Sequence, residues 1–253
     1  MSYQQEKFKE IADKIREKTG ETENIKPADF KDKLEVVYES GKEAERREMW
    51  NKRMEILLNT GWNYAFAGRT WNDETFTPYT DIAMKAGYNI MGFFANTGFT
   101  DLKGIFEKYN TTLDLSKGAN STNLFSSSAV TRIPKLILTA ASSINTAFSN
   151  CVDLVSIDEL SIPKVTSATN AFQNCTSLTE IRISGEIKVS LDLHWSPLSK
   201  ESIESIVSAL SDTASGQAVT FNEAQIETLN GETNWWNELK ATKPNWSFAL
   251  LDV

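Results

Sequence analysis

The two cysteines of the chain take the same place in two similar stretches, NTAFSNCVDLVSI at 145–157 and TNAFQNCTSLTEI at 169–181. Two thiols at matching places could form a disulfide, ligate a metal or include a nucleophile. If the stretches stack, Cys151 and Cys175 lie about one strand spacing (~4.8 Å) apart, which is near enough for a disulfide. We instead expect two buried free thiols acting as small apolar side chains, because a protein folded in a reducing cytoplasm does not depend on a disulfide.

The only histidine is His194, in the stretch LDLHW. With Asp192 and a serine it could form a Ser–His–Asp triad, since residues two apart on an expected strand share a face. The chain has no GxSxG motif to supply that serine, so a structural histidine is favoured. Two cysteines and one histidine are too few for a zinc site, and no GxxxxGK[ST] or GxGxxG loop indicates a bound nucleotide. The sequence therefore predicts no catalytic residue, no metal site and no cofactor.

Two carboxylate pairs, Asp73 with Glu74 and Asp153 with Asp158, could act as the acid and base of a glycoside hydrolase. Carboxylates are abundant, with 34 Asp and Glu against 26 Lys and Arg, so spacing alone selects no catalytic pair. We therefore expect a solvated acidic surface. The net charge of −8 also argues against a nucleic-acid partner, because phosphate binding needs clustered Lys and Arg.

Aromatic residues crowd residues 61–80 and recur as a tryptophan pair at 235–236. Their ring faces could stack on sugar rings, which leaves a glycan-binding interpretation open. The favoured alternative is that these rings pack inside the protein. The rings of 61–80 would pack between the helical part and the rest of the chain, and the tryptophan pair would pack in the C-terminal part. The candidate contacts for a protein partner or a glycan are Trp62, Tyr64, Trp71 and Tyr79.

The first sixty residues carry helical patterns, such as the apolar stripe of Phe8, Ile11 and Ile15. The polar start of the chain is unlike a secretory signal, and no apolar run approaches the ~18 residues of a membrane span. We therefore expect folding in a cytoplasm and no membrane insertion. The charged stretch at 41–61 fits either a solvated helix or a short coiled coil, because its heptads are imperfect. The candidate oligomerisation residues are Leu34, Val37, Ala44, Trp50 and Leu57.

A 24-residue period runs through the Ser-, Thr- and Asn-rich part of the chain. The apolar positions of 136–157 return 24 residues later at 160–181, and an earlier copy near 113–133 is shifted by 23. Buried Leu and Ile with a period of 20–29 residues are typical of a leucine-rich-repeat-like solenoid, in which each repeat adds a short strand. Such a stack needs a cap, and SPLSKESIESIVSALSD predicts a capping helix with Ser199 at its N-cap.

These patterns together predict an α+β protein in four parts. A helical, coiled-coil-like region for attachment or oligomerisation (1–60) leads into an aromatic neck (61–84). A leucine-rich-repeat-like β-solenoid (85–198) follows, and an αβ C-terminal cap (199–253) closes its open edge.

The repeat pattern AF.NC.SL..I.I and the SPLSKESI block resemble BspA-like leucine-rich repeats. The whole chain is similar to structural proteins of bacteriophages and prophages of Gram-positive bacteria. IADKIREKTGETENIKPADF resembles an N-terminal module of tail and baseplate proteins, and YAFAGRTWNDETFTPYTDI resembles the segment that follows it. The resemblance implies a non-enzymatic virion protein of the tail or baseplate, assembled in the cytoplasm of the host bacterium.

The resemblance also implies its partners, which are other tail or baseplate proteins and a glycan or protein of the host cell surface. Tail symmetry and the coiled-coil-like stretch suggest a homo-oligomer, for which we expect a trimer. One alternative is a bacterial surface adhesin of the BspA type, against which the missing signal peptide and wall anchor count. The other is a tail-associated polysaccharide depolymerase.

Overall fold

The computed structural model divides the chain into two compact units, residues 1–55 and 56–253, which are described separately. The residues that it describes are 13, 16, 17, 41–48, 50, 51, 63, 65–68, 72–74, 76, 78, 79, 81–83, 86, 87 and 89–253. In the first unit, residues 41–48 are helical, and the ion pair between Arg47 and Glu43 (3.7 Å) lies on the exposed side of this helix. Most of the predicted coiled-coil-like region therefore lies outside the described residues.

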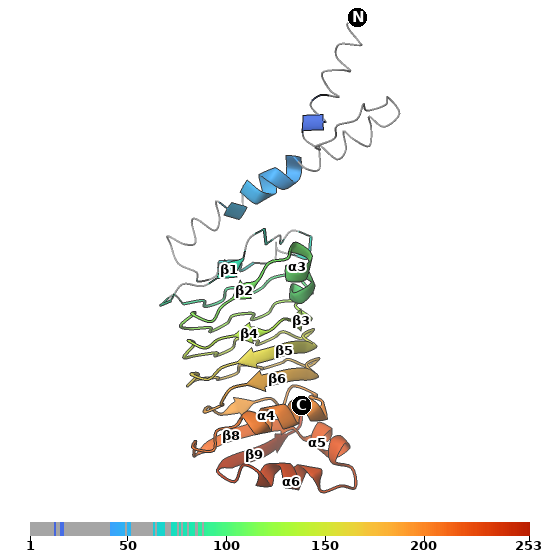
Figure 1. The fold of residues 1–253 in the computed structure, drawn as a ribbon. Coiled ribbons are helices and arrows are strands. Elements are labelled where there is room, and N and C mark those ends of the chain that lie inside the picture. Colours follow the sequence, from blue (N-terminus) through green and yellow to red (C-terminus); the bar gives the residue numbers. More distant parts are fainter. Residues whose placement is uncertain are drawn as a thin grey trace, which may run out of the picture. The chain divides into compact units, whose positions relative to one another are not determined.

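The second unit contains three small sheets in which every strand pair is parallel (Figure 1). One pairs β1 with β2, the next has the order β3-β5-β4 with β6 on β5, and the last has the order β7-β8-β9. The strands are β1 (Ile82–Ala83), β2 (Leu113–Asp114), β3 (Arg132–Ile133), β4 (Leu136–Ile137), β5 (Ser156–Ser161), β6 (Glu180–Ser184), β7 (Leu191–Asp192), β8 (Gln217–Asn222) and β9 (Trp246–Leu251). The helices of this unit are α3 (Leu102–Tyr109), α4 (Lys200–Ala209), α5 (Glu223–Asn230) and α6 (Trp235–Ala241).

The predicted fold class, α+β with a leucine-rich-repeat-like β-solenoid and an αβ cap, is wrong. The described residues form a mixed α/β structure with several small parallel sheets and short helices. Strands β1, β2, β3, β4 and β7 are only two residues long, so no single sheet runs through the predicted repeats. In the C-terminal part, helices α4, α5 and α6 alternate with the strands of a parallel sheet, because parallel neighbours need long crossover connections. That alternation is α/β, whereas α+β requires segregated helices and strands.

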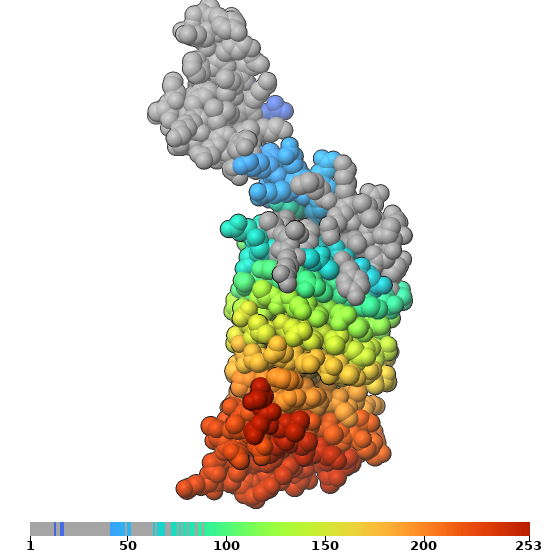
Figure 2. Space-filling model, turned by 180° about the vertical axis from the view of Figure 1, so that it is seen from behind, coloured from blue at the N-terminus to red at the C-terminus, as the bar shows by residue number. Residues whose placement is uncertain are grey.

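The 24-residue offset of the sequence is present in the register of the parallel pairs. Leu136 pairs with Leu160, and Ile157 pairs with Ile181. A column of phenylalanine rings lies inside these repeats, with neighbouring centroids 5.1–5.8 Å apart and rings within 17° of parallel. Its four rings have no exposed surface and belong to Phe94, Phe125, Phe148 and Phe172. In Figure 2, the residues of successive repeats accordingly form consecutive bands of colour from green to orange.

A second backbone ladder, which we call the turn ladder, joins four turn segments: residues 90–96, 120–127, 143–150 and 167–174. Alternate backbone N–H groups of each segment donate to carbonyl groups of the next, as Phe125 does to Ala147 (2.7 Å) and Phe148 does to Ala171 (2.9 Å). Each segment places two residues in the left-handed region of φ, where Gly and Asn are tolerated best. The eight residues are Gly92, Asn96, Asn123, Ser127, Thr146, Asn150, Asn170 and Asn174. The frequent asparagines of this part of the chain therefore allow the left-handed backbone that the turns of the ladder require.

Helix α4 covers the outer edge of β6. Ser199 is its N-cap, as predicted, since the Ser199 hydroxyl accepts a hydrogen bond from the backbone N–H of Ser202. The hydroxyls of Ser202 and Ser205 accept hydrogen bonds from the backbone N–H groups of Ile181 (2.9 Å) and Ile183 (3.2 Å). A neighbouring strand would otherwise take these donors, so α4 protects the sheet edge from pairing with another chain.

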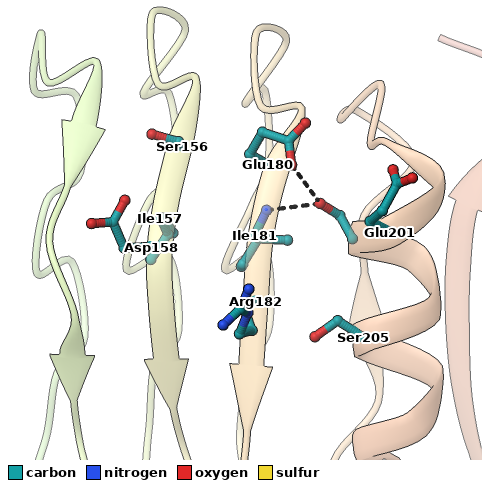
Figure 3. Close-up of a pocket in the computed structure, with 9 residues that line it drawn as sticks. Ser156, Ile157, Asp158, Glu180, Ile181, Arg182, Glu201 and Ser205 are labelled. Atoms are coloured by element: carbon teal, nitrogen blue, oxygen red, sulfur yellow. Dashed lines mark hydrogen bonds between the residues drawn. The ribbon is translucent and has the colours of Figure 1, made fainter.

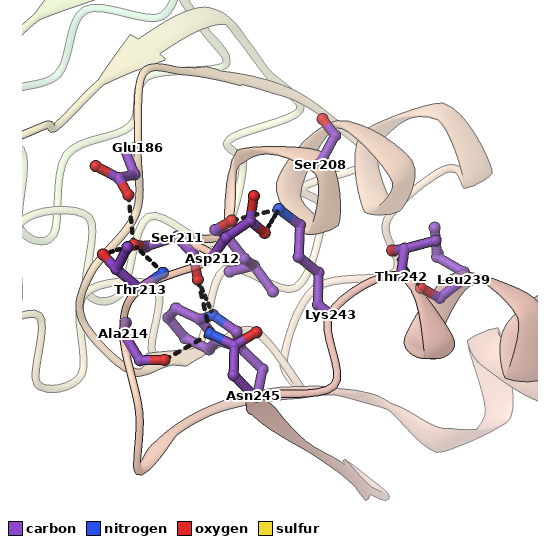
Figure 4. A network of polar contacts seen from close by, with 12 residues as sticks. Glu186, Ser208, Ser211, Asp212, Thr213, Ala214, Leu239, Thr242, Lys243 and Asn245 are labelled. Atoms are coloured by element: carbon purple, nitrogen blue, oxygen red, sulfur yellow. Dashed lines mark hydrogen bonds and ion pairs between the residues drawn. The ribbon is translucent and has the colours of Figure 1, made fainter.

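The C-terminal sheet is held by α6 and by a polar network. The Trp236 ring of α6 packs edge-on against Phe221 and Phe248, with both centroid distances at 5.6 Å. In the network of Figure 4, Asn245 donates to the carbonyl groups of Ser211 (2.9 Å) and Ala214 (2.5 Å). These contacts fix the segment that leads into β9.

Candidate partner-binding surface

The two thiols are buried and free. The Sγ of Cys151 donates to the carbonyl oxygen of Phe125 (3.0 Å), and the Sγ of Cys175 donates to that of Phe148 (3.1 Å). Burial raises the pKa of Cys151 to about 11, and burial together with the nearby Cys151 raises the pKa of Cys175. A nucleophilic cysteine needs a lowered pKa and access to solvent, so these thiols are part of the core.

His194 contacts the predicted partner, Asp192. The Nδ1 of His194 lies 2.6 Å from Oδ1 of Asp192, which also accepts a hydrogen bond from the backbone N–H of His194. The imidazole lies against Trp195 (4.8 Å between centroids), and Asn222 donates to the carbonyl of His194 (2.9 Å). The ring thus contacts Asp192 and Trp195, whereas the bond to Asn222 at the end of β8 is made by the backbone of His194. No serine hydroxyl of the described residues is bonded to the ring.

The predicted carboxylate pairs form other contacts. Asp73 accepts hydrogen bonds from the backbone N–H of Thr100 (2.6 Å) and from its hydroxyl, and so joins two loops. Asp158 forms an ion pair with Lys103 of α3 (2.8 Å). One carboxylate of each pair, Asp73 and Asp158, therefore has a structural partner. Within the described residues, no three His, Cys, Asp or Glu side chains are grouped as a metal site would need, and no helix is long and apolar enough to span a membrane.

The predicted contact residues lie mostly outside the described part of the chain. Among the candidate partner or glycan contacts, Trp62, Tyr64 and Trp71 lie outside it. Tyr79 is half-buried and packs edge-on against Tyr109, with centroids 5.6 Å apart. Of the candidate oligomerisation residues, Leu34, Val37 and Leu57 also lie outside the described residues, whereas Ala44 is exposed and Trp50 is buried. The proposed roles of these nine residues stay predictions.

A cleft of about 180 Å³ lies between β5, β6 and α4 (Figure 3). Charged side chains surround it, including Asp158, Arg182 and Glu201. The hydroxyl of Ser202 in its wall both accepts from Ile181 and donates to the carbonyl of Thr179 (3.1 Å). Part of the polar lining is therefore used to attach α4 to the sheet.

A larger groove of about 330 Å³ lies between the last segment of the turn ladder and the C-terminal sheet. Its lining is rich in hydroxyl and amide groups, and Asp192 is the one charged residue in it. No pattern in the sequence indicates this groove, because residues distant in the chain form its walls. These walls are residues 166–170, 189–192 and parts of β8, namely Gln217, Ala218 and Thr220.

The outer edge of β9 is open. In the three-stranded sheet, β8 pairs with one side of β9, and no strand of the described residues pairs with the other. The sequence of β9, WSFALL, contains no charged residue and no proline, and Ser247, Ala249 and Leu251 are exposed. Figure 2 shows the dark red C-terminal residues on the surface of this unit. This edge lacks the charged side chains and prolines that usually prevent a second chain from pairing with an edge strand.

Comparison with protein-family models, curated proteins and solved structures finds no match to this chain.

Proposed function

We propose that the chain is a non-enzymatic structural protein of a phage tail or baseplate, which takes part in tail assembly and in contact with the host surface. The resemblance of its N-terminal, aromatic and repeat segments to tail and baseplate proteins supports the virion assignment. The observation that carries the structural role is the column of buried rings and the turn ladder beside it. Such repeated contacts between successive segments make a scaffold on which surface residues can be displayed.

The side chains that could do chemistry support a non-catalytic role through the contacts that they form. Cys151 and Cys175 donate to backbone carbonyl groups in the core, and His194 is bonded to Asp192. The two thiols join neighbouring repeats inside the core, away from any substrate, and the backbone carbonyl of His194 is bonded to Asn222.

Assembly needs a surface that accepts another subunit, and we assign this role to the open edge of β9 and a second copy of the chain, which gives a dimer in place of the trimer expected from the sequence. Antiparallel pairing about a two-fold axis would place Ala249 opposite Ala249 of the second copy, with no charged residue on either strand. Two copies that each carry a net charge of −8 repel one another elsewhere, so an uncharged edge is where they can meet. Two of the four exposed large apolar side chains of the described residues are Leu251, the last residue of β9, and Val253, two residues beyond it.

Mass photometry tests this pairing. The full chain should give a species of twice its 28.3 kDa mass, and Ala249→Lys should shift it toward the monomer because two lysines would then face each other. Val155→Lys, an equal charge at an exposed site away from β9, is the control and should leave the mass unchanged. A monomer for the wild-type chain, or an unchanged dimer for Ala249→Lys, would refute the role of β9.

Mass spectrometry of purified phage particles tests the function itself. Peptides of this chain should be found in intact particles at a constant ratio to other tail proteins. Their presence only in the lysate, or release of reducing sugar from host cell wall by the purified chain, would contradict the proposal and favour the adhesin or the depolymerase.

A further inference from the structure

The turn ladder stops where the polar groove begins. In the three preceding segments, the residues equivalent to Ala168 each donate a backbone hydrogen bond of 2.9 Å to the next segment; they are Ile90, Ser121 and Ile144. The residues equivalent to Asn170 also donate, at 2.8–3.0 Å; they are Gly92, Asn123 and Thr146. Within residues 89–253, the backbone N–H groups of Ala168 and Asn170 donate to no carbonyl group. Both residues line the groove.

A buried backbone donor without a protein acceptor needs a water or a ligand. Ala168 is only 5% exposed, so its N–H group has little access to bulk solvent. The break in the ladder therefore presents two directed donors, two residues apart, to whatever occupies the groove.

The opposite wall supplies complementary groups. Oδ1 of Asp192 is bonded to His194, and Oδ2 forms no hydrogen bond with the described residues, which leaves it as an acceptor. The side-chain carbonyl of Gln217 accepts from the backbone and hydroxyl of Ser190, which leaves its NH₂ group as a donor. A fitting ligand must accept hydrogen bonds from the first wall, and must both donate to Asp192 and accept from Gln217 on the opposite wall, within the size of one ring.

These requirements select a class of ligand. Vicinal hydroxyl groups both donate and accept, whereas an anionic ligand would be repelled by Asp192. The lining offers hydroxyl groups in place of the apolar pockets that hold peptide side chains. We propose that this groove binds a neutral saccharide unit of a host cell-surface polysaccharide. This inference rests on the proposed contact with the host surface and gives that contact a place and a chemistry.

Two substitutions test the groove. Asn170→Gly removes a side-chain amide that lines the groove but keeps the backbone N–H and the left-handed backbone (φ 54°), and it should weaken binding about fivefold, the effect of one neutral side-chain hydrogen bond of ~1 kcal/mol. Asn123→Gly is the matched control, because Asn123 has the equivalent place and φ (58°) in an earlier segment outside the groove. Thr220→Trp on β8 fills the groove and should abolish binding.

The probe is a printed array that carries neutral, sialylated and phosphorylated oligosaccharides, to which the labelled full chain is applied. Binding to neutral glycans that Asn170→Gly weakens and Asn123→Gly does not would support the groove. Absence of binding to every neutral glycan, binding to anionic glycans alone, or equal binding by both Asn170→Gly and Thr220→Trp would overturn it. Circular dichroism checks the fold of each variant. The array measures glycan binding without the phage particle. A chain that is present in the virion but binds no neutral glycan would therefore contradict this inference and leave the virion assignment intact.

Discussion

The strongest quantitative prediction concerns the column of phenylalanine rings. Phe148 lies in its interior, fully buried between Phe125 (5.8 Å) and Phe172 (5.1 Å). Phe148→Ala removes a buried ring and leaves a cavity between two others, which costs about 3–5 kcal/mol of unfolding free energy. For a unit of this size, such a loss corresponds to a melting temperature lower by roughly 6–20 °C.

The position of a ring in the column determines how much stability its replacement by alanine costs. Phe172 stacks on Phe148 alone, so Phe172→Ala loses one ring contact where Phe148→Ala loses two. Since a ring pair contributes about 0.5–1.5 kcal/mol beyond burial, the interior substitution should be more damaging by that amount. Val152→Ala, at a side chain that is 42% exposed in the same repeat, should change stability by no more than about 0.5 kcal/mol.

Urea unfolding followed by circular dichroism measures all three variants. A loss below about 1 kcal/mol for Phe148→Ala, or a larger loss for Phe172→Ala than for Phe148→Ala, would refute the account of a continuous buried column.

The other predictions concern the helix edge, a thiol and a turn. Ser202→Ala leaves the buried N–H of Ile181 without an acceptor and should cost about 1–3 kcal/mol in urea unfolding, whereas the exposed Ser208→Ala should be neutral. Because burial raises the pKa of Cys151 from 9.0 to about 11, its contribution to stability is complete below pH 9 and is lost as pH rises toward 11. Unfolding free energy should thus fall by about 2 kcal/mol more between pH 8 and 10.5 in the wild type than in Cys151→Ala, and equal slopes would show an accessible thiol. Thr146→Asn should raise the unfolding free energy by about 0.5–1 kcal/mol in urea unfolding, because a β-branched residue is strained at φ 52°. A decrease would mean that the hydroxyl contacts of Thr146 dominate.

Local features of the fold followed from the sequence where a repeated spacing fixed them. The 24-residue offset predicted which positions align, and Leu136 does pair with Leu160. Ser199 was identifiable as an N-cap because a serine precedes an amphipathic helical pattern. The burial of both cysteines followed from their equivalent places in the repeats.

The fold class and the surfaces did not follow from the sequence. Strand length depends on how far the backbone of each repeat stays in register, which a pattern of buried residues does not specify. Val189, Leu191 and Leu193 continue the apolar alternation of the repeats, so the sequence gives no sign that the turn ladder has ended before them. The groove at that break, and the open edge of β9, depend on which backbone groups find partners in three dimensions.

Cryo-electron microscopy of the purified phage particle tests the central claim most directly. The account predicts density for the repeat unit at the tail tip or baseplate, with the groove between residues 166–170 and 189–192 open toward the outside. A complete tail and baseplate reconstruction in which every density belongs to other chains would contradict it.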